Sequence, residues 1–336
     1  MITRSWSTLV LCLGLLLVSH VDSATAIEDP LPSWNEGAVK SAILRYVERV
    51  VDEESPGYVP VPERVATFDN DGTLWSEKPA YFQLAFAMDR IKALADQNPD
   101  WANQDPFASV LKGDLAAVLS GGEPAIAKLV AASHSGLTVE EFRGLVRDWI
   151  DQAKHPQTNR TYKSMVFQPM LELVRYLESH DFKVFIVSGG GIEFMRAWAE
   201  DVYGIPPERV IGSRAKIEFQ MVDGIPRLNK LPELDFVDDK AGKPVGIATH
   251  IGRRPLLAAG NSDGDLQMLQ YTTVARSKFD TVPRLGLIVH HTDAEREWAY
   301  DRQSHVGKLD RALDLAKGES WIVVDMKRDW VTIYPR

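Results

Sequence analysis

Short, mostly apolar runs recur along the chain, and each is followed by glycine or by polar residues. The clearest lie at residues 65–68, 183–187, 256–259 and 285–289. Runs of this length are typical of strands that are buried on both faces of a parallel sheet, because such strands have no polar face. Apolar residues at helical spacing lie between the runs. The pattern predicts an α/β fold with a doubly wound parallel sheet.

The long segment between the first two runs has helical periodicity. Apolar residues between positions 81 and 95 recur at helical spacing, and Thr138 with Glu141 forms a capping-box pattern before another such stretch. Proline and glycine separate these stretches. We therefore expect a helical insertion at residues 76–168. The expected core then comprises residues 27–75 and 169–336.

Beyond the 285–289 run the sequence gives fewer signals. His290 and His291 follow that run, and we expect them at the edge of a cleft, because no third metal ligand follows at a recognisable spacing. The apolar segments 321–324 and 330–333 are expected to form a closing pair of strands.

The charge balance limits the possible partners. The formal net charge is -9, which argues against nucleic acid or an anionic membrane as a standing partner. The chain has 336 residues, enough for a core and an accessory domain.

The N-terminal residues resemble a secretory leader. Arg4 precedes an apolar run from Leu9 to Val18, and small residues follow up to Ala26. These are the three parts of a signal peptide. An uncleaved anchor is the alternative, but the run is too short to span a bilayer stably. We expect residues 1–26 to be removed, which leaves no stable membrane anchor and no cysteine. Export without disulfides suits a bacterial periplasm.

Two carboxylates follow the first apolar run. Asp69 ends the strand, Asp71 lies two residues later, and Gly72 and Thr73 complete the turn. Open α/β sheets bind ligands at the carboxyl ends of their strands, so Asp69 is expected where such a sheet carries its chemistry. The alternative is an ordinary Asp-Gly turn.

A glycine-rich segment follows the second run. Ser188 and Gly189 begin it, and a helical pattern follows from Ile192. A hydroxyl and glycine amides before a helix form a ready anion site. The competing dinucleotide-binding pattern needs a third glycine where this chain has Phe194, so that interpretation fails.

Together these segments resemble the haloacid-dehalogenase-like superfamily, in particular its phosphoserine-phosphatase-like, aspartate-nucleophile phosphatases. The resemblance implies a Rossmann-like core with an inserted helical cap. It also implies that Asp69 attacks phosphorus and that Asp71 acts as acid and base. A carboxylate nucleophile needs no partner base, whereas the leaving alkoxide needs a proton. Ser188 and Gly189 would bind the phosphoryl group, and Lys243 would screen its charge, with Lys240 as the alternative lysine.

The same resemblance implies a Mg²⁺ site formed by Asp69, Asp71, Asn261 and Asp265. The family pattern after the third run is Gly-Asp-x-x-x-Asp, and Asn261 replaces its first Asp. Mg²⁺ accepts an amide oxygen, but one negative charge is lost unless Asp263 compensates.

Two further features can be compared with the phosphoserine-phosphatase-like group. Residues 215–220, with Asp223 and Gly224 as the turn, resemble its β-hairpin. Glu77 lies one residue short of the position where that group recognises an amino group, so we interpret it as a solvated pair with Lys78.

The sequence therefore predicts an exported, Mg²⁺-dependent phosphatase that hydrolyses a small phosphate monoester through an aspartyl-phosphate. The alternatives are a phosphotransferase that uses the same intermediate and, because of Asn261, a catalytically weakened protein that binds phosphate esters.

Overall fold

The computed structural model describes residues 29–134 and 136–335. The expected leader, residues 1–26, lies outside the described residues. No helix in the described part of the chain is long and apolar enough to cross a membrane.

A seven-stranded, mostly parallel sheet forms the centre of the molecule, with the strand order β4-β3-β2-β1-β5-β6-β7. Every neighbouring pair is parallel except β3–β4, which is antiparallel. All four apolar runs form strands, as the pattern predicted. The strands are β1 (Val65–Phe68), β2 (Lys183–Gly191), β3 (Val210–Val222), β4 (Ile225–Phe236), β5 (Leu257–Gly260), β6 (Leu285–His290) and β7 (Ile322–Asp325).

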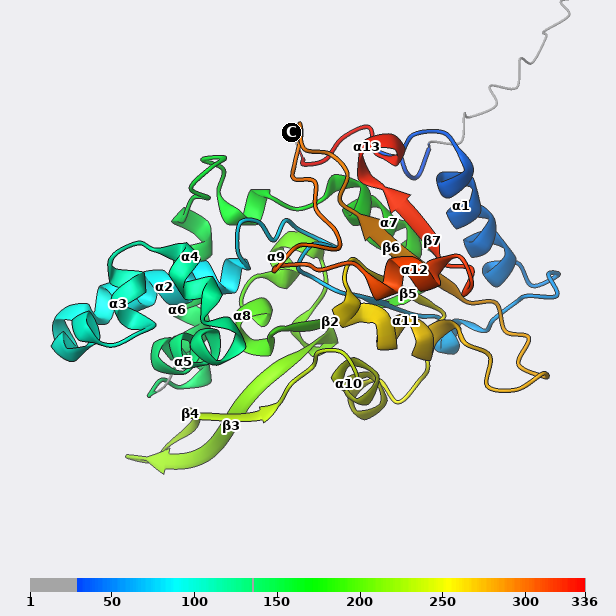
Figure 1. Ribbon diagram of the computed structural model, residues 1–336. Helices are drawn as coiled ribbons and strands as arrows, with labels where there is room; N and C mark the ends of the chain where they lie inside the picture. The colour runs from blue at the N-terminus through cyan, green and yellow to red at the C-terminus, as the bar shows by residue number, and fades with distance from the viewer. Residues whose placement is uncertain (1–28, 135, 336) are drawn as a thin grey trace, which may run out of the picture.

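Helices cover both faces of the sheet. Successive residues of a strand point to opposite sides, so one strand contributes to the apolar clusters on both faces. In β5, Ala259 belongs to the apolar cluster shared with α1 and α7, whereas Ala258 belongs to the cluster shared with α10, α11 and α12. The doubly wound α/β class is therefore confirmed (Figure 1). The core helices are α1 (Ala38–Val51), α7 (Gln168–Ser179), α8 (Ile192–Arg196), α9 (Ala199–Tyr203), α10 (Gly242–His250), α11 (Leu266–Thr273), α12 (Arg311–Ala316) and α13 (Met326–Asp329).

A helical insertion between β1 and β2 forms a group beside the sheet (Figure 1). Its own apolar cluster includes Leu84, Phe107 and Leu129. The expected capping box is present: the Thr138 hydroxyl accepts from the Glu141 amide, and the Glu141 carboxylate accepts from the Thr138 amide. The helices are α2 (Phe82–Leu94), α3 (Phe107–Leu111), α4 (Leu115–Ser120), α5 (Gly122–His134) and α6 (Val139–Gln152). The exact domain boundaries stay a prediction.

The expected hairpin is formed by β3 and β4 and projects below the insertion (Figure 1). Asp223 and Gly224 have φ angles of 53° and 78°, so both turn residues adopt the left-handed conformation that a tight hairpin requires. The Lys230 amide donates to the Leu137 carbonyl at 2.9 Å. The hairpin therefore contacts the insertion directly.

The expectation for the C-terminal strand pair was half wrong. Residues 322–325 form β7, but the chain then turns into α13, and residues 330–333 form no strand. Trp330 instead packs edge-on against Trp34, with ring centroids 5.9 Å apart. Burial of the large indole accounts for the apolar pattern that resembled a strand.

Candidate active site

The end of β1 places Asp69 beside the end of β5, because the Asp69 amide donates to the Ala259 carbonyl at 2.9 Å. The chain then turns: the Thr73 and Leu74 amides both donate to the Asn70 carbonyl. Gly72 has a φ of 73°, and a Cβ atom there would lie 2.0 Å from the Asn261 amide nitrogen. The turn therefore requires glycine for its conformation and for the close approach of Asn261.

Lys243 joins three of the predicted segments. Its ammonium group donates to Asp69 Oδ1 at 2.6 Å, to Asp265 Oδ1 at 2.6 Å and to the Val187 carbonyl at 2.8 Å. Its side chain is only 2% exposed. Although burial opposes the shift, the carboxylates of Asp265 and Asp69 raise the pKa of Lys243, so it is cationic. Lys240, the alternative lysine, has a side chain that is 61% exposed, and its ammonium nitrogen lies 3.7 Å from an Asp239 carboxylate oxygen.

Asp71 lies on the turn after β1, and the Trp75 indole donates to its Oδ1 at 2.8 Å. Burial raises the pKa of the Asp71 carboxyl to about 7. The other oxygen, Oδ2, faces the glycine segment, since a Cβ on Gly190 would lie 3.5 Å from it. A group with this pKa can donate and accept a proton near neutral pH.

Ser188, on β2, lies near the same glycine as Asp71 does, Gly190. Its side chain is buried, and its hydroxyl accepts from the Gly190 amide at 3.1 Å. A Cβ on Gly190 would lie 3.4 Å from the hydroxyl. Gly189 faces Asp239, whose side chain would lie 3.6 Å from a Cβ at that position. Ser188 and Asp71 therefore flank one point of the glycine segment.

Glu77 is not a solvated partner of Lys78, so that interpretation was wrong. It is 1% exposed, and its Oε1 accepts from the Asn261 amide nitrogen at 2.8 Å and from the Tyr300 hydroxyl at 2.7 Å. Lys78 donates instead to Ser304 and, at 2.7 Å, to the Val306 carbonyl. Sequence reasoning missed this role because Tyr300 lies far along the chain and carries no motif.

Asp263 and Asp265 follow β5 and have different partners. Asp265 Oδ1 accepts from Lys243, and its Oδ2 accepts from the amides of Asn261 and Ser262 at 2.9 and 3.0 Å. Asp263 Oδ1 accepts from the amides of residues 310 and 312, at the start of α12. Asp263 therefore holds that helix start, whereas Asp265 fixes the loop and the lysine.

His291 lies under the first turn rather than at the edge of a cleft, so that expectation was wrong. The residue is 2% exposed; Nε2 lies 2.8 Å from the Gly72 carbonyl and Nδ1 lies 3.1 Å from Glu297 Oε2. Although burial opposes the shift, Glu297 raises the pKa of His291. His290 points elsewhere, with Nε2 3.5 Å from an Asp301 carboxylate oxygen.

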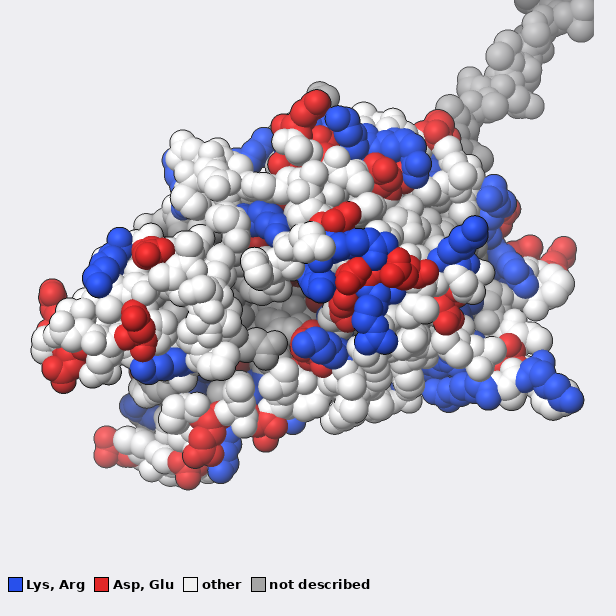
Figure 2. All heavy atoms as spheres, in the orientation of Figure 1, with Lys and Arg blue, Asp and Glu red and all other residues white. Residues whose placement is uncertain are grey.

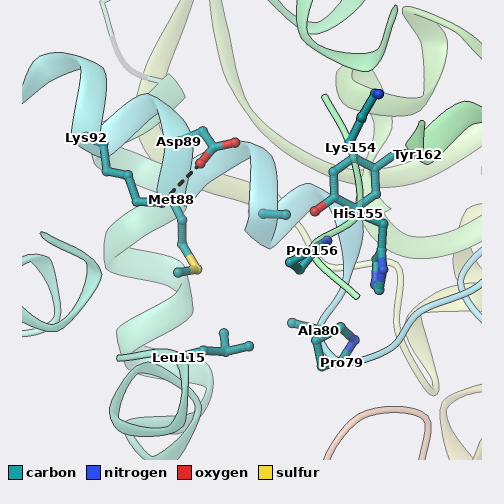
Figure 3. A pocket seen from close by; sticks show the side chains of 11 residues that line it. Pro79, Ala80, Met88, Asp89, Lys92, Leu115, Lys154, His155, Pro156 and Tyr162 are labelled. Carbon is teal, nitrogen blue, oxygen red and sulfur yellow. Dashed lines mark hydrogen bonds and ion pairs between the residues drawn. The ribbon is translucent and has the colours of Figure 1, made fainter. Parts of the chain in front are cut away.

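The surface is hollowed between the helical insertion and the core (Figure 2). A separate cavity of about 210 Å³ lies within the insertion, where Met88, Leu115 and Tyr162 face one another (Figure 3). None of its lining residues belongs to the predicted motifs. The cluster of carboxylates around Lys243, rather than this cavity, defines the candidate active site.

The described residues contain no group of three or more His, Cys, Asp or Glu side chains arranged to hold a metal ion. An amide oxygen such as that of Asn261 can add to a smaller set of carboxylates. Asp69, Asp71 and Asn261 bring oxygen donors to adjacent strand ends, which suits Mg²⁺, a cation that takes few protein ligands and keeps several waters. The donor set therefore fits magnesium without a dedicated cage.

The family model of the haloacid dehalogenase-like hydrolases matches residues 66–270, a range that includes Asp69, Asp71, Ser188, Lys243, Asn261 and Asp265. The chain belongs to this family. No significant match was found among curated protein sequences.

Solved structures also resemble this haloacid dehalogenase-like protein. A conserved protein of unknown function from Anaerococcus prevotii DSM 20548 has a TM-score of 0.49 and 18% identity, covering 76% of this chain and 86% of that one. A phosphoserine phosphohydrolase-like protein from Francisella tularensis has a TM-score of 0.41 and 14% identity, covering 79% and 95%. A probable phosphoserine phosphatase from Vibrio cholerae has a TM-score of 0.37 and 15% identity, covering 76% and 65%.

Proposed function

We propose that this protein is a Mg²⁺-dependent phosphatase that hydrolyses a small phosphate monoester through an aspartyl-phosphate. The observation that carries the proposal is the contact of Lys243 with both Asp69 and Asp265, beside Asp71 and Ser188. A buried cation between two carboxylates holds the nucleophile in place and adds positive charge where phosphoryl oxygens would lie.

The reaction has two steps. In the first, the Asp69 carboxylate attacks phosphorus, the ester P–O bond breaks, and Asp71 gives its proton to the leaving oxygen. In the second, Asp71 takes a proton from water, the water oxygen attacks phosphorus, and the acyl phosphate releases Asp69 and inorganic phosphate. Ser188 and Gly189 orient the phosphoryl group throughout.

Asp69, Asp71 and Asn261 are the residues proposed to hold Mg²⁺. When bound, the cation would neutralise part of the phosphoryl charge. The sequence also placed Asp265 among the metal ligands, but its two oxygens accept from Lys243 and from the loop amides. We therefore propose that Asp265 holds these groups in place without contacting the cation. The substrate is proposed to be a small phosphorylated molecule.

Two other functions remain alternatives. A phosphotransferase would pass the phosphoryl group from Asp69 to an alcohol instead of water. The neutral Asn261 favours the second alternative, a protein that binds phosphate esters without turnover. A panel of phosphate esters, assayed with and without glycerol as acceptor, separates the three by the yields of free phosphate and of phosphorylated acceptor.

Asp69→Asn is the decisive variant, because it keeps the size of the side chain and removes the attacking charge. Activity should fall by several orders of magnitude, on the order of the loss seen when a covalent nucleophile is removed. Asp100→Asn, in a surface segment of the insertion, is the matched control. Near-native turnover by Asp69→Asn would eliminate the aspartyl-phosphate mechanism.

We also propose that the protein is exported and begins at Ile27 after cleavage, on the basis of the leader pattern alone. Mass measurement of the protein recovered from its host tests this. A full-length chain retained in the cytoplasm would contradict it.

A further inference from the structure

Gln83 connects the helical insertion to the glycine segment that follows β2. It lies in the first turn of α2, and its side-chain Oε1 accepts from the Gly191 amide at 2.7 Å. A Cβ on Gly191 would lie 2.6 Å from the Gln83 amide nitrogen. Glycine at position 191 therefore lets the glutamine approach the backbone.

The Gln83 side chain also reaches the point that Ser188 and Asp71 flank. A Cβ on Gly190 would lie 3.6 Å from Gln83 Oε1, 3.5 Å from Asp71 Oδ2 and 3.4 Å from Ser188 Oγ. Three polar oxygens from three separate segments therefore converge there. Of these segments, only α2 belongs to the insertion.

His134, at the end of α5, fixes the orientation of the Gln83 amide. The Ser133 hydroxyl donates to the Val130 carbonyl at 3.1 Å, so it accepts from His134 Nδ1, which lies 2.6 Å away. With its proton on Nδ1, the ring offers Nε2 as an acceptor to the Gln83 amide nitrogen at 3.3 Å. The Gln83 oxygen must then face Gly191.

The surroundings keep His134 neutral. Its ring packs against Phe142 and edge-on against Phe86, and the residue is 8% exposed. Burial, with the nearby charges of Lys230 and Arg90, lowers the pKa of His134 to about 3. The ring therefore stays an acceptor at neutral pH, and the direction of every hydrogen bond in the chain is determined.

We propose that Gln83, oriented by His134, is a positioning residue that fastens the helical insertion to the phosphoryl-binding segment Ser188–Gly191. The segment is then held in its binding geometry only while α2 and α5 are seated against the core. The catalytic part of this inference rests on the proposed function. The hydrogen bond between Gln83 and Gly191 can be tested without any assay of activity.

The test compares four variants of the full mature protein. Gln83→Leu removes both bonds at similar size, and His134→Phe removes the acceptor. His134→Gln supplies an amide oxygen in its place, and Gln152→Leu, an exposed glutamine on α6, is the matched control. Hydrogen–deuterium exchange of the peptide covering residues 186–192 reports the state of the segment without any assay of turnover.

We expect Gln83→Leu and His134→Phe to exchange this peptide faster, on the order of tenfold, because a neutral hydrogen bond is lost. The value of kcat for p-nitrophenyl phosphate should fall about tenfold in the same two variants, with a smaller change in KM. His134→Gln should restore both readouts, and Gln152→Leu should change neither. A merely structural role would lower thermal stability without this rescue of kcat.

Unchanged exchange in both Gln83→Leu and His134→Phe would overturn the proposal. If the wild-type protein turned over no phosphate ester, the proposed function would fail. The exchange data would still decide whether Gln83 fastens the segment, so the two failures are distinguishable.

Discussion

Glu77 Oε1 accepts a hydrogen bond from the Asn261 amide nitrogen at 2.8 Å. The bond fixes the Asn261 amide, because a carboxylate accepts only from the nitrogen side. The amide oxygen is accordingly turned to Thr73, whose hydroxyl donates to it at 3.3 Å. Asn261 is neutral where the family pattern has a carboxylate, and a buried carboxylate stands directly behind it.

Glu77 is therefore predicted to supply the negative charge that Asn261 lacks. Glu77→Gln should weaken Mg²⁺ binding, because a charge near the cation is replaced by a dipole. Adding Asn261→Asp to Glu77→Gln should restore the affinity, so the two substitutions should be non-additive. Calorimetric titration with Mg²⁺ measures this directly, and equal affinities in the wild type and Glu77→Gln would refute the compensation.

Asp263 is predicted to have no part in metal binding. Asp263→Ala removes the acceptor at the start of α12 and should lower the free energy of unfolding by about 1 kcal/mol, as for other lost caps. Mg²⁺ affinity should stay unchanged in the same titration. A clear loss of affinity would restore Asp263 as the compensating acid.

Lys243 is predicted to stabilise the fold as well as the reaction. Lys243→Met leaves the carboxylates of Asp69 and Asp265 buried without their cation, which should cost about 3–5 kcal/mol in denaturant unfolding at pH 7. Lys240→Met, at the exposed alternative lysine, should stay within about 0.5 kcal/mol of the wild type. Similar losses in the two variants would mean that the buried contacts contribute little.

His134 should make stability depend on pH. Its pKa is lowered to about 3 in the folded protein and lies near 6.5 when unfolded, so the unfolded state binds the extra proton between these values. The stabilisation is complete above pH 6.5 and is lost progressively as the pH falls towards 3. Between pH 7.5 and 5.5 the loss should be about 1.4 kcal/mol. His134→Gln should remove this share of the pH dependence in denaturant unfolding, and an unchanged dependence would contradict the neutral ring.

The sequence predicted the fold and the main motifs because both depend on local pattern. Buried strands appear as apolar runs, and parallel strands bring their carboxyl ends to one edge, so Asp69, Ser188 and the 260–265 segment meet. The position of the hairpin turn followed from Asp223 and Gly224 in the same way.

The supporting contacts could not be predicted, because they join residues without local signals. Glu77 and Tyr300 are 223 positions apart, and Gln83 and Gly191 are 108 apart. A glutamate next to a lysine in the sequence is usually exposed, whereas Glu77 is buried. Trp330 was misassigned because a buried indole and a strand residue give the same apolar signal.

The contacts of Lys243 also set an order of assembly. Asp69 is separated from Lys243 by 174 positions, and Asp265 from it by 22. During synthesis Asp69 therefore emerges long before Lys243, and β1 cannot complete its surroundings until β2 and β5 have paired with it. A nascent chain that ends before residue 243 holds both motif carboxylates of the first turn but not the ammonium group that contacts Asp69. The candidate active site can form only when most of the chain has been made.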